Sequence, residues 1–143
     1  MKRIATTELI SSLLILLFCY TALSKLFSVA HFEAVLEQSP LISSGAALLA
    51  WQVPLTELCI VLLLFFPHTR VAGLYGSLLL LGLFTIYLVY MVLFSQHLPC
   101  SCGGVISSMS WPVHIGFNGV CIGITMVAIR NPEKVERIGS WRH

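Results

Sequence analysis

VAGLYGSLLLLGLFTIYLVYMVLF, from Val71 to Phe94, is the stretch that decides the fold. It holds no Asp, Glu, Lys, Arg or His, and it is longer than the roughly 20 apolar residues that cross a bilayer as a helix. The alternation of apolar and polar positions that a membrane β-barrel requires is absent from it. The stretch therefore predicts a transmembrane helix over residues 71–94.

Three further apolar stretches lie around it, over residues 8–27, 45–66 and 112–129. The composition of the 143 residues agrees, because 57% are hydrophobic and only 10% are charged, whereas soluble domains carry roughly a quarter charged residues. Helices satisfy their own backbone groups in lipid. We therefore predict an all-α fold, a single transmembrane four-helix bundle over residues 1–143, with a short tail over 130–143.

The basic residues indicate the orientation of this bundle. All of them except Lys25 lie at the amino end, between the second and third spans, or in the tail: Lys2, Arg3, Arg70, Arg130, Lys134, Arg137 and Arg142. Four spans put these three regions on one side, and the positive-inside rule makes that side cytoplasmic. We expect both termini there and the connections 28–44 and 95–111 outside. No basic patch with interleaved aromatics exists, so we expect membrane lipid and no nucleic acid as a partner.

The second outer connection contains the segment Pro99-Cys100-Ser101-Cys102-Gly103-Gly104. Two thiols one residue apart can close a small, strained disulfide, and such disulfides tend to be labile. The two glycines leave backbone N–H groups free to approach a thiolate. We hypothesise that Cys100 and Cys102 are a redox-active pair, and a structural disulfide is the alternative. Only His97 and His114 lie nearby in sequence, too few for an ordinary metal site, so we predict no metal.

Two charged residues fall inside the spans. Glu57 lies about 12 residues into the second span, near the bilayer midplane, and Lys25 lies within about one turn of the outer surface. Their depths differ by roughly 13 Å, so we expect no direct pair, and Gln52 or Glu33 is the expected polar partner of Lys25. Glu57 is a candidate for proton handling or ligand binding, and a protonated structural hydrogen bonder is the alternative.

In the fourth span, His114, Asn118, Cys121 and Thr125 recur at helical spacing and form one polar stripe. A histidine near a thiol can take its proton, and a polar stripe inside a bundle can line a route for a quinone or for protons. The alternative is a stripe that only joins helices by hydrogen bonds. We select His114 and Asn118, with Glu57, as candidate quinone or proton-route residues; a quinone is the only cofactor the pattern suggests.

Two local patterns bear on packing. Residues 30–38 predict a short amphipathic helix at the interface, with apolar and acidic positions on different faces: Phe32, Val35 and Leu36 against Glu33 and Glu37. Glycines permit close approach of a neighbouring helix in two spans: Gly73, Gly76 and Gly82 in the third, and Gly116, Gly119 and Gly123 in the fourth.

Four spans, the outer Cys-Ser-Cys-Gly-Gly loop, Ser24-Lys25-Leu26, and Pro54 followed by Glu57-Leu58 together resemble the MauE/DoxX family of redox-associated membrane proteins. The methylamine-utilisation MauE branch is the most similar. The resemblance covers roughly residues 8 to 130, and its most specific part is the segment 99–104. It implies a bacterial inner-membrane protein with extracytoplasmic thiol chemistry, acting beside a thioredoxin-like partner.

A fold-level analogy connects the chain to four-helix quinone-linked disulfide generators, which generally use two cysteine pairs. This chain has one Cys-x-Cys and no cysteine in its other outer connection. The missing pair favours an external thiol partner over a complete internal relay.

We interpret the chain as a thiol–disulfide oxidoreductase or its membrane electron conduit. Cys100 or Cys102 would exchange with a thioredoxin-like or disulfide-containing protein, and electrons would pass to a quinone or in the reverse direction. We favour Cys100 as the attacking thiol, because the glycine turn flanks Cys102. Two alternatives stay open: a non-catalytic assembly subunit of a larger membrane complex, and a small transporter that uses Glu57 and the fourth-span stripe as a homo-oligomer.

Overall fold

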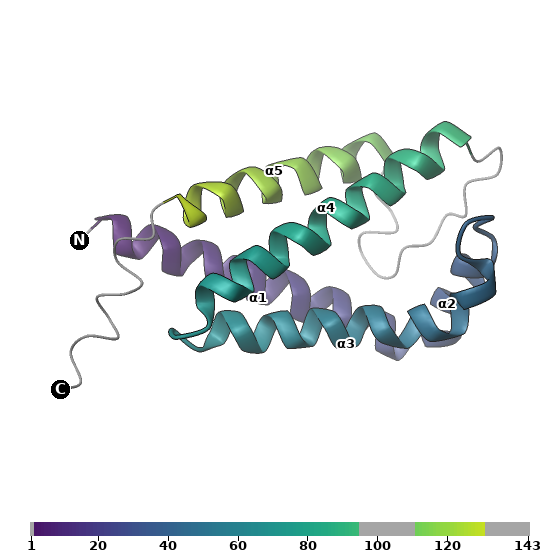
Figure 1. Cartoon of the computed structure of the whole chain (residues 1–143), viewed down its shortest axis with the longest axis horizontal. Coiled ribbons are helices and arrows are strands. Elements are labelled where there is room, and N and C mark those ends of the chain that lie inside the picture. Colours follow the sequence, from purple (N-terminus) through teal and green to yellow (C-terminus); the bar gives the residue numbers. More distant parts are fainter. Residues whose placement is uncertain (1, 95–110, 131–143) are drawn as a thin grey trace.

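A computed structural model describes residues 2–94 and 111–130, which form a bundle of helices (Figure 1). Within these residues there are five α-helices, one 3-10 turn and no strand. The elements are, in chain order, α1 (Lys2–Phe27), α2 (Val29–Glu37), η1 (Ser43–Gly45), α3 (Ala46–Phe65), α4 (Arg70–Phe94) and α5 (Trp111–Ile129). The all-α prediction is confirmed.

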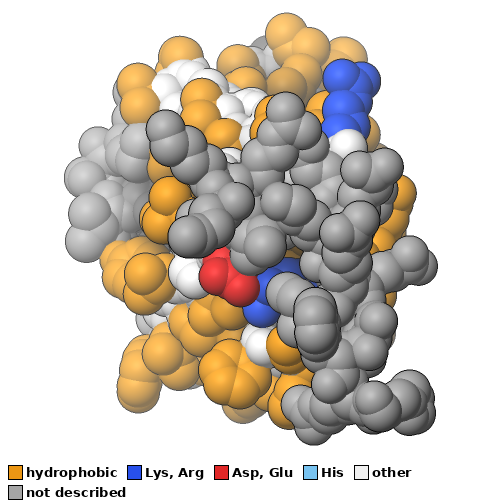
Figure 2. Space-filling view, turned by 90° about the vertical axis from the view of Figure 1, so that its left-hand side faces the viewer, with side chains coloured by type: hydrophobic (Ala, Val, Ile, Leu, Met, Phe, Trp, Pro, Cys, Tyr) orange, Lys and Arg blue, Asp and Glu red, His pale blue; other side chains and the backbone are white. Residues whose placement is uncertain are grey.

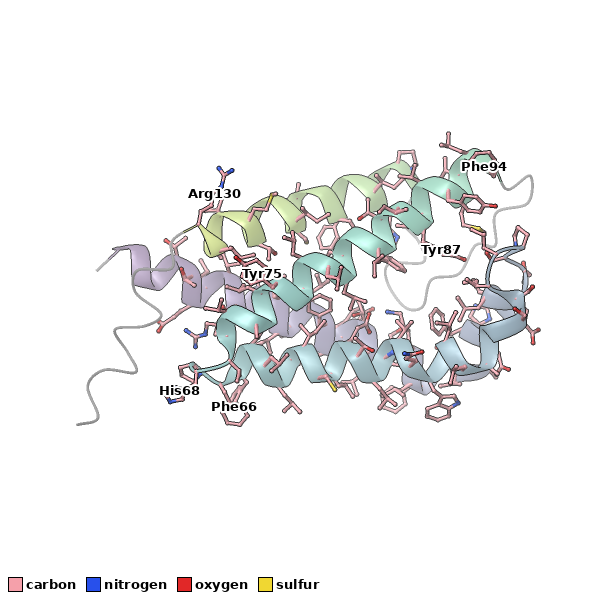
Figure 3. All side chains as sticks on the ribbon, viewed as in Figure 1. Phe66, His68, Tyr75, Tyr87, Phe94 and Arg130 are labelled. Atoms are coloured by element: carbon pink, nitrogen blue, oxygen red, sulfur yellow. The ribbon has the colours of Figure 1, made fainter. Side chains whose placement is uncertain are left out.

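Four of these helices are long and apolar enough to cross a membrane. The spans are Thr6–Phe27, Ser43–Phe65, Arg70–Phe94 and Pro112–Ile129, and their bounds differ from the predicted ones by at most two residues. Their large apolar side chains point outward, and Leu16, Leu48 and Leu93 are each about 70% exposed (Figure 3). Such a surface suits lipid rather than water, because a soluble protein does not leave so large an apolar area uncovered.

The spanning helices associate as two closely packed pairs, α1 with α3 and α4 with α5. Figure 1 shows that the pairs converge where residues 66–69 connect α3 to α4, and that they diverge toward the opposite end, where α2 lies. We call these the turn end and the α2 end of the bundle. The pairs are joined mainly by contacts between α3 and α4.

The short helix α2 covers the beginning of α3. Its buried residues are Phe32, Val35 and Leu36, the three that the sequence places on one face. Phe32 and Leu36 pack against Ala46 and Ala50 of α3. The predicted amphipathic helix is therefore confirmed, and its apolar face is turned toward the bundle.

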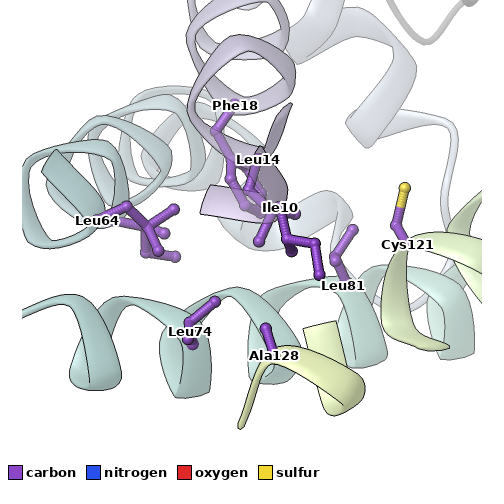
Figure 4. Packing of buried hydrophobic residues seen from close by; sticks show 9 residues of the cluster. Ile10, Leu14, Phe18, Leu64, Leu74, Leu81, Cys121 and Ala128 are labelled. Atoms are coloured by element: carbon purple, nitrogen blue, oxygen red, sulfur yellow. The ribbon is translucent and has the colours of Figure 1, made fainter. Parts of the chain in front are cut away.

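An apolar layer fills the bundle near the turn end (Figure 4). All four spanning helices contribute to it: Ile10, Leu14, Phe18, Ile60, Leu64, Leu74, Leu81, Cys121 and Ala128. Here the side chains interdigitate as they do in other close-packed protein interiors. We use the name apolar layer for this set below.

Gly73 is the position at which α3 and α4 come closest. A Cβ built there would lie 2.8 Å from the backbone nitrogen of Leu64 and 2.9 Å from its Cγ. A Cβ at Gly82, on the same helix, would meet nothing within 4 Å. The close approach that the sequence predicts is thus made at Gly73 and not at Gly82, and Gly119 and Gly123 of α5 also face open space.

We expect Gly73→Ala to destabilise the bundle by about 1–3 kcal/mol, because backbone atoms of α3 must move to admit the methyl group. Gly82→Ala is the matched control and should be neutral or stabilising by up to about 1 kcal/mol, since Ala is the better helix former. Thermal unfolding in detergent compares the two variants. Equal stability of both would contradict the close packing of α3 against α4.

Arg70 and Arg130 lie at the turn end. Figure 3 labels Phe66, His68 and Arg130 there, and Tyr87 and Phe94 toward the α2 end. Figure 2 views the turn end directly and shows Lys or Arg side chains among a largely apolar surface. This distribution agrees with the orientation that the sequence predicts for residues 2–94 and 111–130.

Candidate functional site

The centre of the site is a buried ion pair between α1 and α3. Lys25 Nζ lies 2.6 Å from Glu57 Oε1 and donates a hydrogen bond to it. Both residues are buried, with 9% and 5% of their surface exposed. The prediction that Lys25 and Glu57 form no direct pair is therefore wrong.

The cause of that error is the position of α2. The prediction placed the outer ends of the first two spans at one depth, but α2 occupies the space beside the first two turns of α3. The end of α1 consequently lies beside the middle of α3, at the level of Glu57. Lys25 and Glu57, whose depths estimated from sequence position differ, are therefore in direct contact.

The other expected partners of Lys25 lie elsewhere. The side chain of Gln52 is exposed on the outer surface of α3. The backbone carbonyl oxygen of Gln52 accepts a hydrogen bond from Thr56 Oγ1 at 2.8 Å. Glu33 is half-buried on α2. The ammonium of Lys25 also lies 5.8 Å from the ring centroids of both Phe32 and Phe84, close enough for weak cation–π attraction.

A pocket opens beside the ion pair, in the half of the bundle nearer to α2. The space open to the centre of a water molecule is about 70 Å³, enough for a few waters or a small polar head group. Its lining is mostly apolar and aromatic with a few convergent polar groups, as in ligand sites generally. We call it the polar pocket; its residues are Leu17, Phe18, Thr21, Lys25, Val53, Glu57, Leu80, Leu81, Phe84, His114, Phe117 and Asn118.

Two buried polar atoms of pocket residues have no hydrogen-bond partner among residues 2–94 and 111–130. They are Oε2 of Glu57, an acceptor when the carboxyl is ionised, and Nδ2 of Asn118, a donor. A buried polar atom without a partner costs about 1–3 kcal/mol. A group that offers both a donor and an acceptor, such as ordered water or a ligand, would satisfy these two atoms.

The predicted polar stripe of α5 divides between two environments. His114 and Asn118 line the polar pocket, and the ring of His114 lies 5.7 Å from that of Phe84. Cys121 belongs to the apolar layer, and the buried Thr125 donates its hydroxyl hydrogen to the carbonyl oxygen of Cys121 at 2.7 Å. The structure thus brings Glu57, His114 and Asn118 together, as the sequence analysis grouped them.

Cys100 and Cys102 lie outside the described residues. They belong to the segment that connects Phe94, the last residue of α4, to Trp111, the first residue of α5. His114 follows three positions after Trp111, so the polar pocket begins one turn beyond this segment. Cys19, Cys59 and Cys121 are free cysteines.

The sequence analysis selected four of the twelve pocket residues and missed the other eight, among them one polar residue, Thr21, and the aromatic residues Phe84 and Phe117. Thr21 lies one turn before Lys25 on the same face of α1, and this spacing is a signal that could have found it. Phe84 and Phe117 carry no such signal, because aromatic residues are common throughout apolar spans. Only the packing of α4 and α5 shows that these two rings face the ion pair.

The donor set fits a neutral ring that carries oxygen atoms better than it fits a metal ion. Among residues 2–94 and 111–130, no three His, Cys, Asp or Glu side chains lie close enough to hold a metal. Lys25 and Asn118 supply donors, Glu57 supplies an acceptor, and Phe84 and Phe117 add aromatic rings to the lining. Because the ammonium and the carboxylate compensate each other, an uncharged ligand suits the pocket best.

Comparison with known proteins identifies the family. No curated protein and no solved structure matches the chain. The family described as methylamine utilisation protein MauE matches over residues 3–130, which is most of the chain and includes all four spans and the segment 99–104. With its four apolar spanning helices, the chain therefore belongs to the MauE family, as a multi-pass membrane protein related to methylamine utilisation.

Proposed function

We propose that this protein is a membrane thiol–disulfide oxidoreductase. It exchanges electrons between the Cys100–Cys102 pair and a quinone whose head group occupies the polar pocket. The observation that carries the proposal is the pair of unsatisfied buried atoms, Glu57 Oε2 and Asn118 Nδ2, in a pocket whose two charges compensate each other and whose lining includes aromatic residues. A quinone carbonyl accepts from Asn118, and a quinol hydroxyl donates to Glu57.

The reaction balances without any further reactant. A dithiol partner reduces the Cys100–Cys102 disulfide through a mixed disulfide and leaves as a disulfide. The reduced pair is then oxidised back, releasing two electrons and two protons, and the quinone takes up both to become a quinol. Run in reverse, the same steps deliver reducing equivalents to a partner's disulfide.

The expected partner is a separate protein of thioredoxin-like fold or a substrate that carries disulfides. The connection 28–44 holds no cysteine, so the chain has no second outer pair to pass electrons to. The proposed location is the inner membrane of a bacterium, with residues 95–110 on the extracytoplasmic side, where disulfides persist. The basic residues Arg70 and Arg130 at the turn end support this orientation.

The pocket assignment is tested with Asn118→Leu. We expect quinone binding to weaken about tenfold, because the lost hydrogen bond contributes about 1 kcal/mol or slightly more. Stability should change little, since Asn118 Nδ2 has no partner in the free protein. Titration of the purified protein with a decyl-chain benzoquinone gives the dissociation constant, and thermal unfolding gives the stability.

Thr125→Val is the matched control on the same face of α5. Thr125 is fully buried, but it lies outside the polar pocket and its hydroxyl bonds only to its own helix. Quinone affinity should be unchanged in this variant. If Thr125→Val and Asn118→Leu weaken binding equally, or if neither does, the polar pocket is not the quinone site.

A second candidate function, a docking subunit of a larger membrane complex, is favoured by one face of α3. Gln52 and Thr56 lie on that face in a shallow groove with apolar neighbours such as Trp51 and Leu55. A glutamine amide on a lipid-facing surface is costly unless another helix satisfies it. This candidate predicts stable co-purification with a partner and tolerance of Cys100→Ser and Cys102→Ser.

A further inference from the structure

The polar pocket and the apolar layer occupy opposite halves of the bundle. On every spanning helix the pocket residues lie nearer to the α2 end and the layer residues nearer to the turn end. The pocket residues lie within 17–25 of α1, 53–57 of α3, 80–84 of α4 and 114–118 of α5. The layer residues lie within 10–18 of α1, 60–64 of α3, 74–81 of α4 and 121–128 of α5. All four spanning helices therefore share this division between the polar pocket and the apolar layer.

The apolar layer separates the pocket from the turn end. Phe18 and Leu81 belong to both sets, so they form the boundary between pocket and layer. From Ile10 to Phe18 the layer is about 12 Å thick at the ordinary helical rise. Proton transfer over that distance needs a continuous chain of hydrogen-bonding groups or water, and an apolar interior of this kind stays dry.

The hydroxyl groups at the level of the layer do not form such a chain. Ser77 donates to the carbonyl oxygen of Gly73 at 2.8 Å, and Thr125 donates to that of Cys121 at 2.7 Å, so both hydroxyl hydrogens are used within their own helices. Ser11 Oγ is buried and has no hydrogen-bond partner, although it sits next to Ile10 of the layer. Thr7, one turn from Ser11 toward the turn end, is also buried, but no buried hydroxyl of α1 lies between Ser11 and Thr21, so Thr7 and Ser11 do not form a proton relay across the layer.

The backbone geometry closes the same half. The contact of Gly73 with Leu64 brings α3 and α4 together near the turn end, whereas the helix pairs diverge toward the α2 end (Figure 1). Among residues 2–94 and 111–130, the titratable groups that line the polar pocket together with Glu57 are Lys25 from α1 and His114 from α5. From α4 the pocket receives only Leu80, Leu81 and Phe84, none of which titrates.

We infer that the polar pocket exchanges protons and water only with the α2 end of the bundle. This inference rests on the proposed function, and one-sided proton exchange makes the proposed electron transfer electroneutral. The thiol pair releases two protons on the side of the α2 end, and the quinone takes up two protons from that same side. No net charge crosses the membrane, so the protein neither builds up nor consumes a proton gradient.

Proteoliposomes test this directly. The full-length protein is reconstituted with a decyl-chain benzoquinone in the bilayer and a pH-sensitive dye in the lumen. A reduced thioredoxin-fold protein is added outside, where it reaches only molecules whose 95–110 segment faces it. We expect one quinol per disulfide, an unchanged lumenal pH, and a rate unaffected by an imposed potassium diffusion potential. Lumenal alkalinisation by two protons per disulfide would overturn the inference.

A second measurement does not depend on redox activity. Thr21→Cys and Ser11→Cys are each placed in a full-length background in which Cys19, Cys59, Cys100, Cys102 and Cys121 are replaced by Ser, and retained helicity is checked by circular dichroism. A small charged methanethiosulfonate reagent is then applied to membrane vesicles of either orientation. We expect Thr21→Cys to react only from the side of the α2 end and Ser11→Cys to react from neither side.

The two experiments separate the two claims. Absence of turnover with every quinone and thiol partner counts against the proposed oxidoreductase, and the labelling pattern then decides the sidedness of the pocket by itself. Reaction of Thr21→Cys from the turn end contradicts the inference, whatever the turnover. Turnover together with labelling from the α2 end alone supports both.

Discussion

A Cys102→Ser variant is expected to lose turnover by a factor of about 10³ or more and to accumulate a mixed disulfide between Cys100 and its partner. The variant is tested in the reverse direction, with an oxidised partner: the remaining thiolate attacks the partner's disulfide, and this chain has no second thiol to release the reduced partner. Cys100→Ser should lose turnover to the same extent without trapping the partner, because the favoured attacking thiol is gone. Non-reducing electrophoresis of the protein with a thioredoxin-fold partner shows the trapped species.

Cys59→Ser is the control for this pair of variants. Cys59 is a free cysteine on the exposed surface of α3, away from the polar pocket, so its replacement should leave turnover unchanged. Full turnover in both Cys100→Ser and Cys102→Ser would refute the oxidoreductase. That result would favour the docking subunit, in which these cysteines serve only the structure of their loop.

Lys25→Met is expected to reduce the free energy of unfolding by about 3 kcal/mol, because it leaves the carboxylate of Glu57 buried without its counter-charge. Quinone reduction should fall as well, since the charge of Glu57 in the pocket is then no longer compensated. The measurement is the free energy of unfolding in mixed micelles of increasing denaturing detergent. The effect is large because, among the described residues, Lys25 is the only cation paired with Glu57, so no other charge compensates the carboxylate.

The double variant Lys25→Met with Glu57→Leu should recover most of the lost stability. Replacing both members of a buried ion pair by apolar residues is often neutral, since neither charge must then leave water. It should not recover quinone reduction, because the proton acceptor Glu57 is also removed. If the single and double variants are equally stable, the ion pair at 2.6 Å contributes nothing to the packing of α1 against α3.

Hydropathy and helical periodicity were enough to predict the spans and the short helix. The four apolar stretches lie within two residues of the observed spans, because in lipid a long apolar run has almost no alternative to a helix. The buried face of α2 followed from Phe32, Val35 and Leu36 for the same reason. Periodicity on one helix also grouped His114 with Asn118, and the requirement that charge be rare in a span singled out Glu57.

The partner of Lys25 could not be predicted in this way. Depth estimated from sequence position assumes that neighbouring helices begin at one level, and α2 removes that equality by packing against the start of α3. In the same way, the sequence offers six glycines for close helix approach, and only the arrangement of α3 against α4 shows that Gly73 makes the tightest of these approaches, with Gly76 next, where a Cβ would lie 3.4 Å from Ile60. Registers between helices depend on side-chain packing across the bundle, which a single helix does not encode.

By itself, therefore, the sequence determined the four membrane spans, the short covering helix and the Cys-Ser-Cys segment of a MauE family protein, because each depends on local composition or spacing. The tertiary structure alone decided that Lys25 and Glu57 meet, that Phe84 and Phe117 complete a pocket around them, and that an apolar layer closes one side of it. These features arise from the vertical offset between α1 and α3 and from the divergence of the two helix pairs, and both are properties of packing between helices.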